Sequence, residues 1–110
     1  MIAREVFELQ SRLCQAMSNA VRLEIIHILR EGPQNVGRMA VMLGISHTAT
    51  SRQLAVLRNN GLVTIQRQGQ ENLYALANPK IGEICNLMRQ VLAELLAHQA
   101  EVATSLEKRE

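Results

Sequence analysis

Aromatic residues are scarce in this chain of 110 residues, which contains one Phe, one Tyr and no Trp. Proteins that bind single-stranded nucleic acid stack the bases on aromatic side chains, so that mode of binding is not expected here. Uninterrupted apolar runs are also short, which excludes a membrane-spanning helix of about 20 apolar residues. The sequence lacks a nucleophile elbow and a phosphate-binding glycine loop as well, so no enzyme is predicted.

The amino terminus has no continuous apolar segment of the kind that directs secretion. Arg4, Glu5 and Glu8 fall within an amphipathic pattern there, which is not the pattern of a secretory signal. We therefore expect a cytoplasmic protein that contacts no membrane. With 47% hydrophobic and 20% charged residues, the composition is that of one globular domain with a modest core.

Acidic residues are absent from the middle of the chain, between Glu31 and Glu71. The net charge is only +2, so total charge does not by itself predict nucleic-acid binding. From residue 46 to residue 72, however, three arginines stand against a single glutamate. An ordinary solvated helix face mixes acids with bases, so this segment favours a surface that binds phosphates.

The acid-free segment contains a predicted helix with signals at both ends. Ser46 can cap its amino terminus, and Gly61 suits the left-handed position that ends a helix. Ala49, Leu54 and Leu57 are expected to face a core. The opposite face is polar and free of carboxylates, a surface that can lie in a DNA groove; it carries His47, Thr48, Ser51, Arg52 and Arg58.

Two further helices are expected before this one. A first amphipathic helix has its apolar stripe at Ile2, Val6, Leu9, Leu13 and Ala16. A second helix from residue 20 to about residue 30 follows, capped by Asn19. Its inner face is formed by Leu23, Ile26 and Leu29 and is widened by Val21, Ile25 and Ile28.

A short third helix, capped by Asn35 and ended by Gly44, directly precedes the polar helix. Two helices joined by a tight turn containing glycine form the helix-turn-helix pattern. After residue 61 the period changes to two, and residues 63–66 and 73–76 are expected to pair through a turn at residues 68–70. A hairpin in this place is a wing, so the fold predicted is mainly α with a small β-hairpin, a winged helix-turn-helix.

The last predicted helix begins at Asn78-Pro79 and is longer than one small core can bury. Its apolar residues repeat in a heptad rhythm, at Ile81, Ile84, Met88, Val91, Leu95 and Val102, and His98 is a polar break in the same rhythm. Together with the amphipathic first helix, this pattern predicts a homodimer formed through the first and last helices. We expect one domain over residues 1–104 and a polar, frayed tail over residues 105–110.

The chain resembles the ArsR/SmtB family of repressors from about Phe7 to Leu96. The resemblance is carried by residues 13–19 (LCQAMSN), 22–26 (RLEII), 46–58 (SHTATSRQLAVLR), 61–63 (GLV) and 74–76 (YAL) in this order. It implies a homodimer that binds a palindromic operator in double-stranded DNA and is released by an inducer. It places His47, Thr48, Ser51, Arg52 and Gln53 in the major groove, and Arg67 and Gln70 of the wing on the backbone or minor groove. For Arg52, base readout and a phosphate contact both stay open.

The metal sites that recur in this family are not matched here. Its thiolate pair in the third helix would fall on Asn35 and Gly37. Its zinc site in the last helix would fall on four positions of which only Glu94 is a ligand type: Asn78, Lys80, Val91 and Glu94. His98 and Glu101 form at most half a site, and His27 is expected to be a core residue. No metal and no cofactor are predicted.

The two cysteines, Cys14 and Cys85, lie in the predicted first and last helices. One interpretation is that both are small buried hydrophobes. The other is that they sense an inducer by oxidation, by uptake of reactive sulfur or by capture of arsenite, because a disulfide in a reducing compartment is regulatory rather than structural. The main hypothesis is therefore a repressor released by chemistry at these thiols. The alternatives are the same repressor with structural cysteines and another inducer, and a helical protein-interaction dimer that does not bind DNA.

Overall fold

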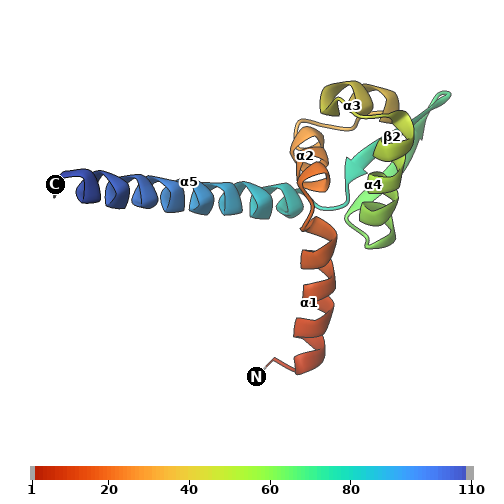
Figure 1. The fold of residues 1–110 in the computed structure, drawn as a ribbon. Coiled ribbons are helices and arrows are strands. Elements are labelled where there is room, and N and C mark those ends of the chain that lie inside the picture. The colour runs from red at the N-terminus through yellow and green to blue at the C-terminus, as the bar shows by residue number, and fades with distance from the viewer. Residues whose placement is uncertain (1, 109–110) are drawn as a thin grey trace.

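Five helices and one antiparallel hairpin follow one another along residues 2–108, the part of the chain that this computed structural model describes (Figure 1). The helices are α1 (Arg4–Met17), α2 (Ala20–Leu29), α3 (Val36–Leu43), α4 (His47–Asn59) and α5 (Pro79–Lys108). The strands are β1 (Val63–Gln68) and β2 (Glu71–Leu76), between α4 and α5. This order confirms the predicted winged helix-turn-helix.

At α2, α3 and α4, the side chain of the residue before the helix accepts a hydrogen bond from one amide of the first turn, as the sequence predicts. Asn19 accepts a hydrogen bond from the amide of Arg22 at 3.1 Å, and Asn35 accepts one from the amide of Arg38 at 2.8 Å. The hydroxyl of Ser46 accepts one from the amide of Ala49 at 3.0 Å. Gly44 ends α3 with a φ of +69°, and Gly61 follows α4 with a φ of +75°, a conformation that glycine adopts without steric cost.

Removing the cap of α4 should lower the stability of the fold. We expect Ser46→Ala to reduce the free energy of unfolding by about 1 kcal/mol, because an amide of the first turn loses its acceptor. Thermal unfolding at a fixed protein concentration measures this change. Ser46→Asp, which keeps a capping oxygen, should stay close to the parent; equal melting temperatures for Ser46→Ala and the parent would contradict the assignment.

The core lies where α2, α3, α4 and the base of the hairpin meet. Ile25, Ile26, Met39, Leu54 and Leu57 are all fully buried there. Leu23, which was expected on the inner face of α2, is 37% exposed, whereas Ile25, which was expected to widen that face, is fully buried. Apolar residues surround most of α2, so the periodicity did not distinguish its inner side from a second apolar side. Thr50 is also fully buried; its hydroxyl donates to the Ser46 carbonyl at 2.9 Å.

The hairpin pairs Val63 with Leu76 at its base and Gln68 with Glu71 at its tip. The turn therefore consists of residues 69 and 70, and the second strand begins two residues earlier than the expected residue 73. The base of the hairpin is tied to the segment before α3, because Gln34 and Tyr74 exchange two backbone hydrogen bonds, of 3.0 and 2.8 Å. This bridge holds the wing against the helix-turn-helix.

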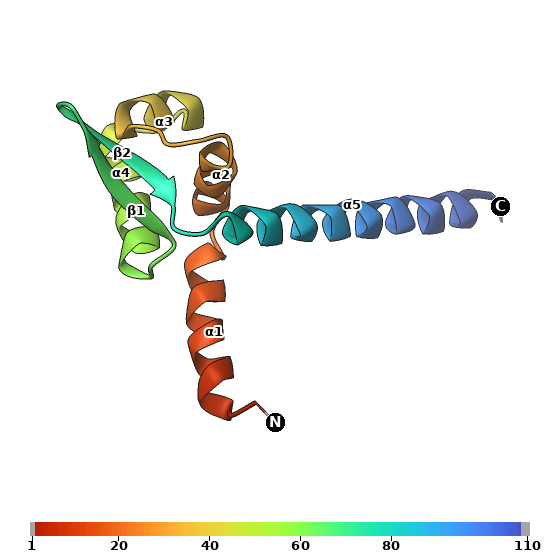
Figure 2. The ribbon, with the colours of Figure 1, turned by 180° about the vertical axis from the view of Figure 1, so that it is seen from behind.

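Helices α1 and α5 project from the winged-helix body in different directions (Figures 1 and 2). The radius of gyration is 17.9 Å, compared with about 13 Å for a compact domain of this size. Among the described residues, no Cα atom of α1 lies within 8 Å of a Cα atom of α5. The two helices therefore do not pack along each other within one protomer, although the side chain of Met17 at the end of α1 reaches α5. The sequence showed their apolar faces but not where each chain would direct them.

The free parts of α1 and α5 keep their apolar side chains in solvent. Val6, Phe7, Leu9 and Leu13 of α1 are exposed, as are Ile84, Met88, Val91, Leu95 and Val102 of α5. α5 also continues through Lys108, so four residues of the expected tail are helical; residues 109 and 110 lie outside the described part. None of the helices within residues 2–108 has the length and apolarity needed to cross a membrane.

Candidate nucleic-acid interface

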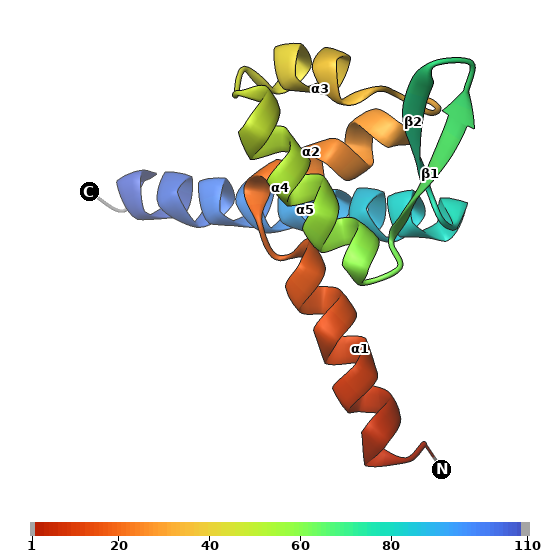
Figure 3. The same cartoon turned by 90° about the vertical axis from the view of Figure 1, so that its right-hand side faces the viewer.

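The helix α4 and the hairpin lie on the side of the molecule away from the free end of α5 (Figure 1). When this side faces the viewer, α4 crosses the front with α3 above it and the hairpin beside it (Figure 3). The first turns of α4 follow α3 after the short turn at residues 44–46, so α3 can rest against a DNA backbone while α4 enters a groove. The arrangement is that of a helix-turn-helix with its wing.

The predicted DNA-binding residues belong to α4 and the hairpin, and they differ in how far their side chains are exposed to solvent. Those on α4 that are exposed are His47, Thr48, Arg52 and Arg58, whereas Ser51 and Gln53 are half-buried. In the hairpin, Arg67 and Gln70 are exposed. None of the side-chain hydrogen bonds within residues 2–108 engages Arg52, so its guanidinium is free to meet a base edge or a phosphate.

Gln53 is committed to a contact within the protein. Its side-chain oxygen accepts a hydrogen bond of 2.8 Å from the guanidinium of Arg22, which lies in α2. In the sequence, Arg22 stands out only as part of a motif, at residues 22–26. A separation of 31 residues hid this pair from any local pattern.

Both cysteines line one apolar groove between the end of α1, the start of α2 and α5. The groove has a volume of about 360 Å³. Cys14 is exposed, whereas Cys85 is 4% exposed, and its Sγ lies 3.9 Å from the Met17 sulfur. The structure therefore brings the two predicted thiols to one place; the other residues lining the groove are Met17, Ser18, Leu23, Ile84, Met88, Arg89 and Leu92.

The two thiols are nevertheless too far apart to bond directly within a protomer. Because no Cα atom of α1 lies within 8 Å of one of α5, Cys14 and Cys85 exceed the separation of about 7 Å that a disulfide can bridge without backbone movement. A direct bond inside one chain therefore requires the end of α1 to move toward α5.

Burial raises the pKa of the Cys85 thiol above its ordinary value, while the positive charges of Arg89 and Arg30 partly oppose this rise.

We expect Arg89→Gln to raise the pKa of the Cys85 thiol further, since the substitution removes the larger of the two opposing charges. Less thiolate is then present at any given pH, and alkylation of Cys85 by iodoacetamide at pH 8 should slow several-fold. Peptide mass spectrometry over a pH series measures the rate. Lys80→Gln, which removes a charge at the start of α5, serves as the control. An alkylation rate that does not change in Arg89→Gln at any pH would contradict the assignment.

His27 is not the core residue that was expected. It is exposed, and its Nδ1 lies 3.2 Å from a guanidinium nitrogen of Arg89. α2 presents it to α5 rather than to the core, because residues 25, 26 and 29 already occupy the buried side. Within residues 2–108, no three His, Cys, Asp or Glu side chains gather as they would around a metal ion.

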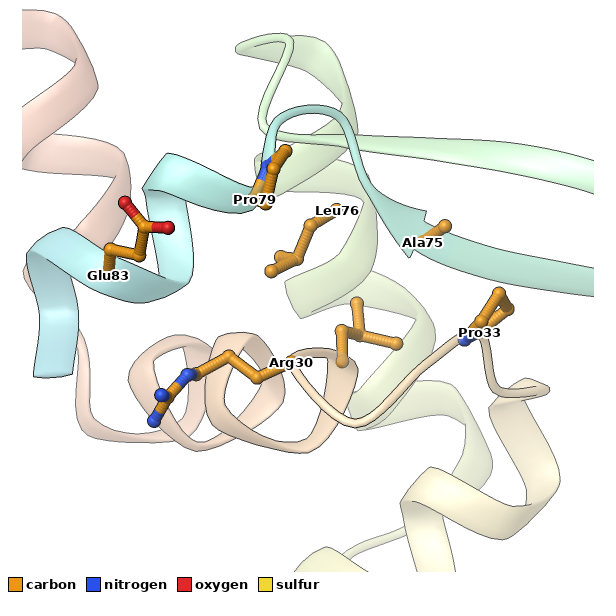
Figure 4. Close-up of a pocket in the computed structure, with 7 residues that line it drawn as sticks. Arg30, Pro33, Ala75, Leu76, Pro79 and Glu83 are labelled. Carbon is orange, nitrogen blue, oxygen red and sulfur yellow. The ribbon is translucent and has the colours of Figure 1, made fainter.

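A separate hollow of about 380 Å³ lies between the end of α2, the end of β2 and the start of α5. Figure 4 shows Arg30 and Glu83 at one side of it, and Pro33 and Ala75 at the other. It includes neither cysteine and none of the predicted DNA-binding residues. It has no part in the candidate interface.

Comparison with known proteins places this architecture in one family. The family model for the bacterial regulatory protein, arsR family, matches residues 19–64, from the cap of α2 into β1. The HTH-type transcriptional regulator NmtR of Mycobacterium tuberculosis is 35% identical over 95 residues, which cover 86% of this chain and 73% of that protein.

Two solved structures show the same fold. A homodimeric winged helix-turn-helix DNA-binding domain from Mycobacterium bovis is 28% identical, with a TM-score of 0.78 over 86% of this chain and 88% of that one. The transcriptional repressor BigR of Xylella fastidiosa is 30% identical, with a TM-score of 0.69 over 82% of this chain and 96% of that one. The chain therefore belongs to the ArsR family of bacterial transcriptional regulators, which bind DNA through a winged helix-turn-helix and are not enzymes.

Proposed function

We propose that two copies of this chain form a homodimeric repressor that binds a palindromic operator and is released by chemistry at Cys14 and Cys85. The observation that carries the DNA-binding part is the acid-free polar face of α4, presented beside the wing on the side away from α5. Such a protein acts in the cytoplasm, where the DNA is.

The apolar faces of α1 and α5 support the dimer. Contiguous exposed apolar surface of this kind marks an interaction site, and the similar domain from Mycobacterium bovis is homodimeric. A two-fold axis near these helices presents two copies of α4 to successive major grooves of one duplex. We therefore expect half-sites centred about 10 bp apart.

Within each half-site, the amino-terminal turns of α4 provide the contacts to bases. Thr48, Ser51 and Arg52 are the side chains on this face that have donors or acceptors of suitable length, with His47 at the start of the helix. Arg58, Arg67 and Gln70 lie farther out and contact phosphates, which fix the register of the protein without reading sequence. Gln53 keeps its amide nitrogen as a donor while its oxygen is held by Arg22.

The common groove supports release through the two thiols. A peroxide can oxidise them to a disulfide, with both sulfurs losing a proton and the peroxide reduced to two waters. Arsenite can condense with them, with loss of two waters and formation of two As–S bonds. Two sulfane sulfur atoms can also react with the two thiols: one atom bridges them as a trisulfide, and the other is reduced and leaves as hydrogen sulfide. Each product favours a different position of α1 from the reduced protein, and so shifts the dimer toward a form whose α4 helices no longer match successive grooves.

The test begins with selection of an operator from a random duplex library by the reduced dimer. Affinity for the selected duplex should fall steeply with added salt, because phosphate contacts release counterions. Absence of binding to any duplex at low salt would leave only the protein-interaction dimer.

The sensor is tested on the same operator. Peroxide, a sulfane-sulfur donor and arsenite are titrated against the complexes of the parent, Cys14→Ser and Cys85→Ser. We expect at least one reagent to release the parent and neither variant. If both variants release DNA as the parent does, the cysteines are structural and the inducer is another molecule.

A further inference from the structure

Arg22 joins three helices through one half-buried guanidinium. Its Nε donates to the carbonyl of Ala16 at 2.6 Å, and one terminal nitrogen donates to the carbonyl of Gln15 at 3.3 Å. The other terminal nitrogen donates to the side-chain oxygen of Gln53 at 2.8 Å. One side chain of α2 therefore contacts the last turn of α1 and the middle of α4.

The contact of Arg22 with α1 has an electrostatic cause. The last carbonyls of a helix have no partner within the helix and carry a partial negative charge. The last turn of α1 contains no basic residue, so Arg22 provides the positive charge from outside the helix. The position of the guanidinium is therefore set by two carbonyls in the last turn of α1, which lie one and two residues beyond Cys14.

The contact with α4 is specific in geometry. A guanidinium directs its donors in a fixed planar fork, so two donors placed on α1 determine where the third points. Gln53 lies beside Arg52 on the helix that faces DNA, and its half-buried side chain holds that helix from its flank. A shift of the α1 carbonyls must then either move Gln53 or break the hydrogen bond.

We propose that Arg22 is a positioning residue that couples the end of α1 to α4 through Gln53 and so sets the placement of α4 for operator binding. The effect of this coupling on operator binding rests on the proposed function. Movement of α1 toward α5, which a direct bond between the thiols requires, reaches α4 by this route.

A double-mutant cycle on the reduced protein tests the coupling. Arg22→Met should weaken operator binding about tenfold, the scale of a lost hydrogen bond to a charged group, and leave affinity for a random duplex unchanged. In a Gln53→Met background the same substitution should cost much less, because the bond is already absent. Arg22→Lys, which keeps the charge without the fork, should fall between. Arg12→Met, which removes a neighbouring exposed arginine of α1, is the matched control.

Hydrogen exchange without DNA separates this inference from the proposed function. Gln53→Met changes α4 only, yet it should accelerate amide exchange at residues 14–18 as well as in α4, and leave α3 unchanged. The coupling is overturned if amide exchange in Gln53→Met rises in α4 alone. It is also overturned if the effects of Arg22→Met and Gln53→Met on operator affinity are additive. If no duplex binds, the proposed function fails and the exchange result alone decides the role of Arg22.

Discussion

Leu95→Glu is expected to abolish tight operator binding while the protomer stays folded. Leu95 is 56% exposed within the protomer, so a charge there removes no contact of the winged-helix core. In the proposed dimer the same position lies in the apolar seam of α5, where two buried carboxylates would be left without partners. The dimer then dissociates, and the two copies of α4 are no longer held together.

The loss follows from the linkage of two half-sites. Joining two binding modules raises the overall affinity by roughly 100-fold to 10,000-fold over one module, and a dissociated protomer loses this gain. Sedimentation gives the oligomeric state, circular dichroism gives the fold, and fluorescence anisotropy with an operator duplex gives the affinity.

Ala97→Glu provides the matched control. Residue 97 lies on the opposite side of α5, in line with Gln90, Glu94 and Glu101, given the helical repeat of 3.6 residues. It adds the same charge to the same helix and should leave both the dimer and its affinity near those of the parent. A dimeric Leu95→Glu protein that binds the operator normally would show that α5 does not form the interface.

Arg52→Ala is expected to weaken operator binding by about 30-fold to more than 10,000-fold per dimer if the residue contacts a base. Each good contact of an arginine with a base is worth about 1–3 kcal/mol, and each dimer presents the residue twice. The side chain is exposed and makes no hydrogen bond within the described residues, so the fold should not change. Arg4→Ala removes the same charge at the far end of α1 and serves as the control.

The pattern of the loss distinguishes the two roles left open for Arg52. If it reads a base, Arg52→Ala relaxes preference at one operator position and spares binding to random duplex. If it contacts a phosphate, all duplexes weaken equally and the slope of log affinity against log salt decreases by about one per arginine lost. An unchanged operator affinity would remove Arg52 from the interface.

Local signals in the sequence predicted most of the fold. Capping residues such as Asn19, Asn35 and Ser46 act on amides two or three positions away, so their pattern is visible in a short window. The change of period after residue 61 predicted the wing for the same reason. The acid-free face of α4 was visible too, because helical periodicity assigns its residues to one side.

Contacts between distant residues could not be predicted in this way. α2 is apolar on two sides, and only the packed structure showed that Ile25 enters the core while Leu23 lines the thiol groove. Thr50 carries a polar hydroxyl, yet it is buried, because that hydroxyl donates a hydrogen bond to a carbonyl one turn earlier. Gln53 was expected to face DNA alone, and its bond to Arg22 depends on how α2 and α4 cross.

The sequence by itself therefore determined the order of the elements, the polar helix beside a wing and the presence of two thiols in the terminal helices. Only the tertiary structure decided that these thiols share a groove without being able to bond directly, and that Arg22 joins the end of α1 to α4. The physical reason is the separation along the sequence over which each signal acts. Caps, turns and periodicity act over a few residues. The crossing of helices depends on the packing of the whole core and brings together side chains separated by tens of residues.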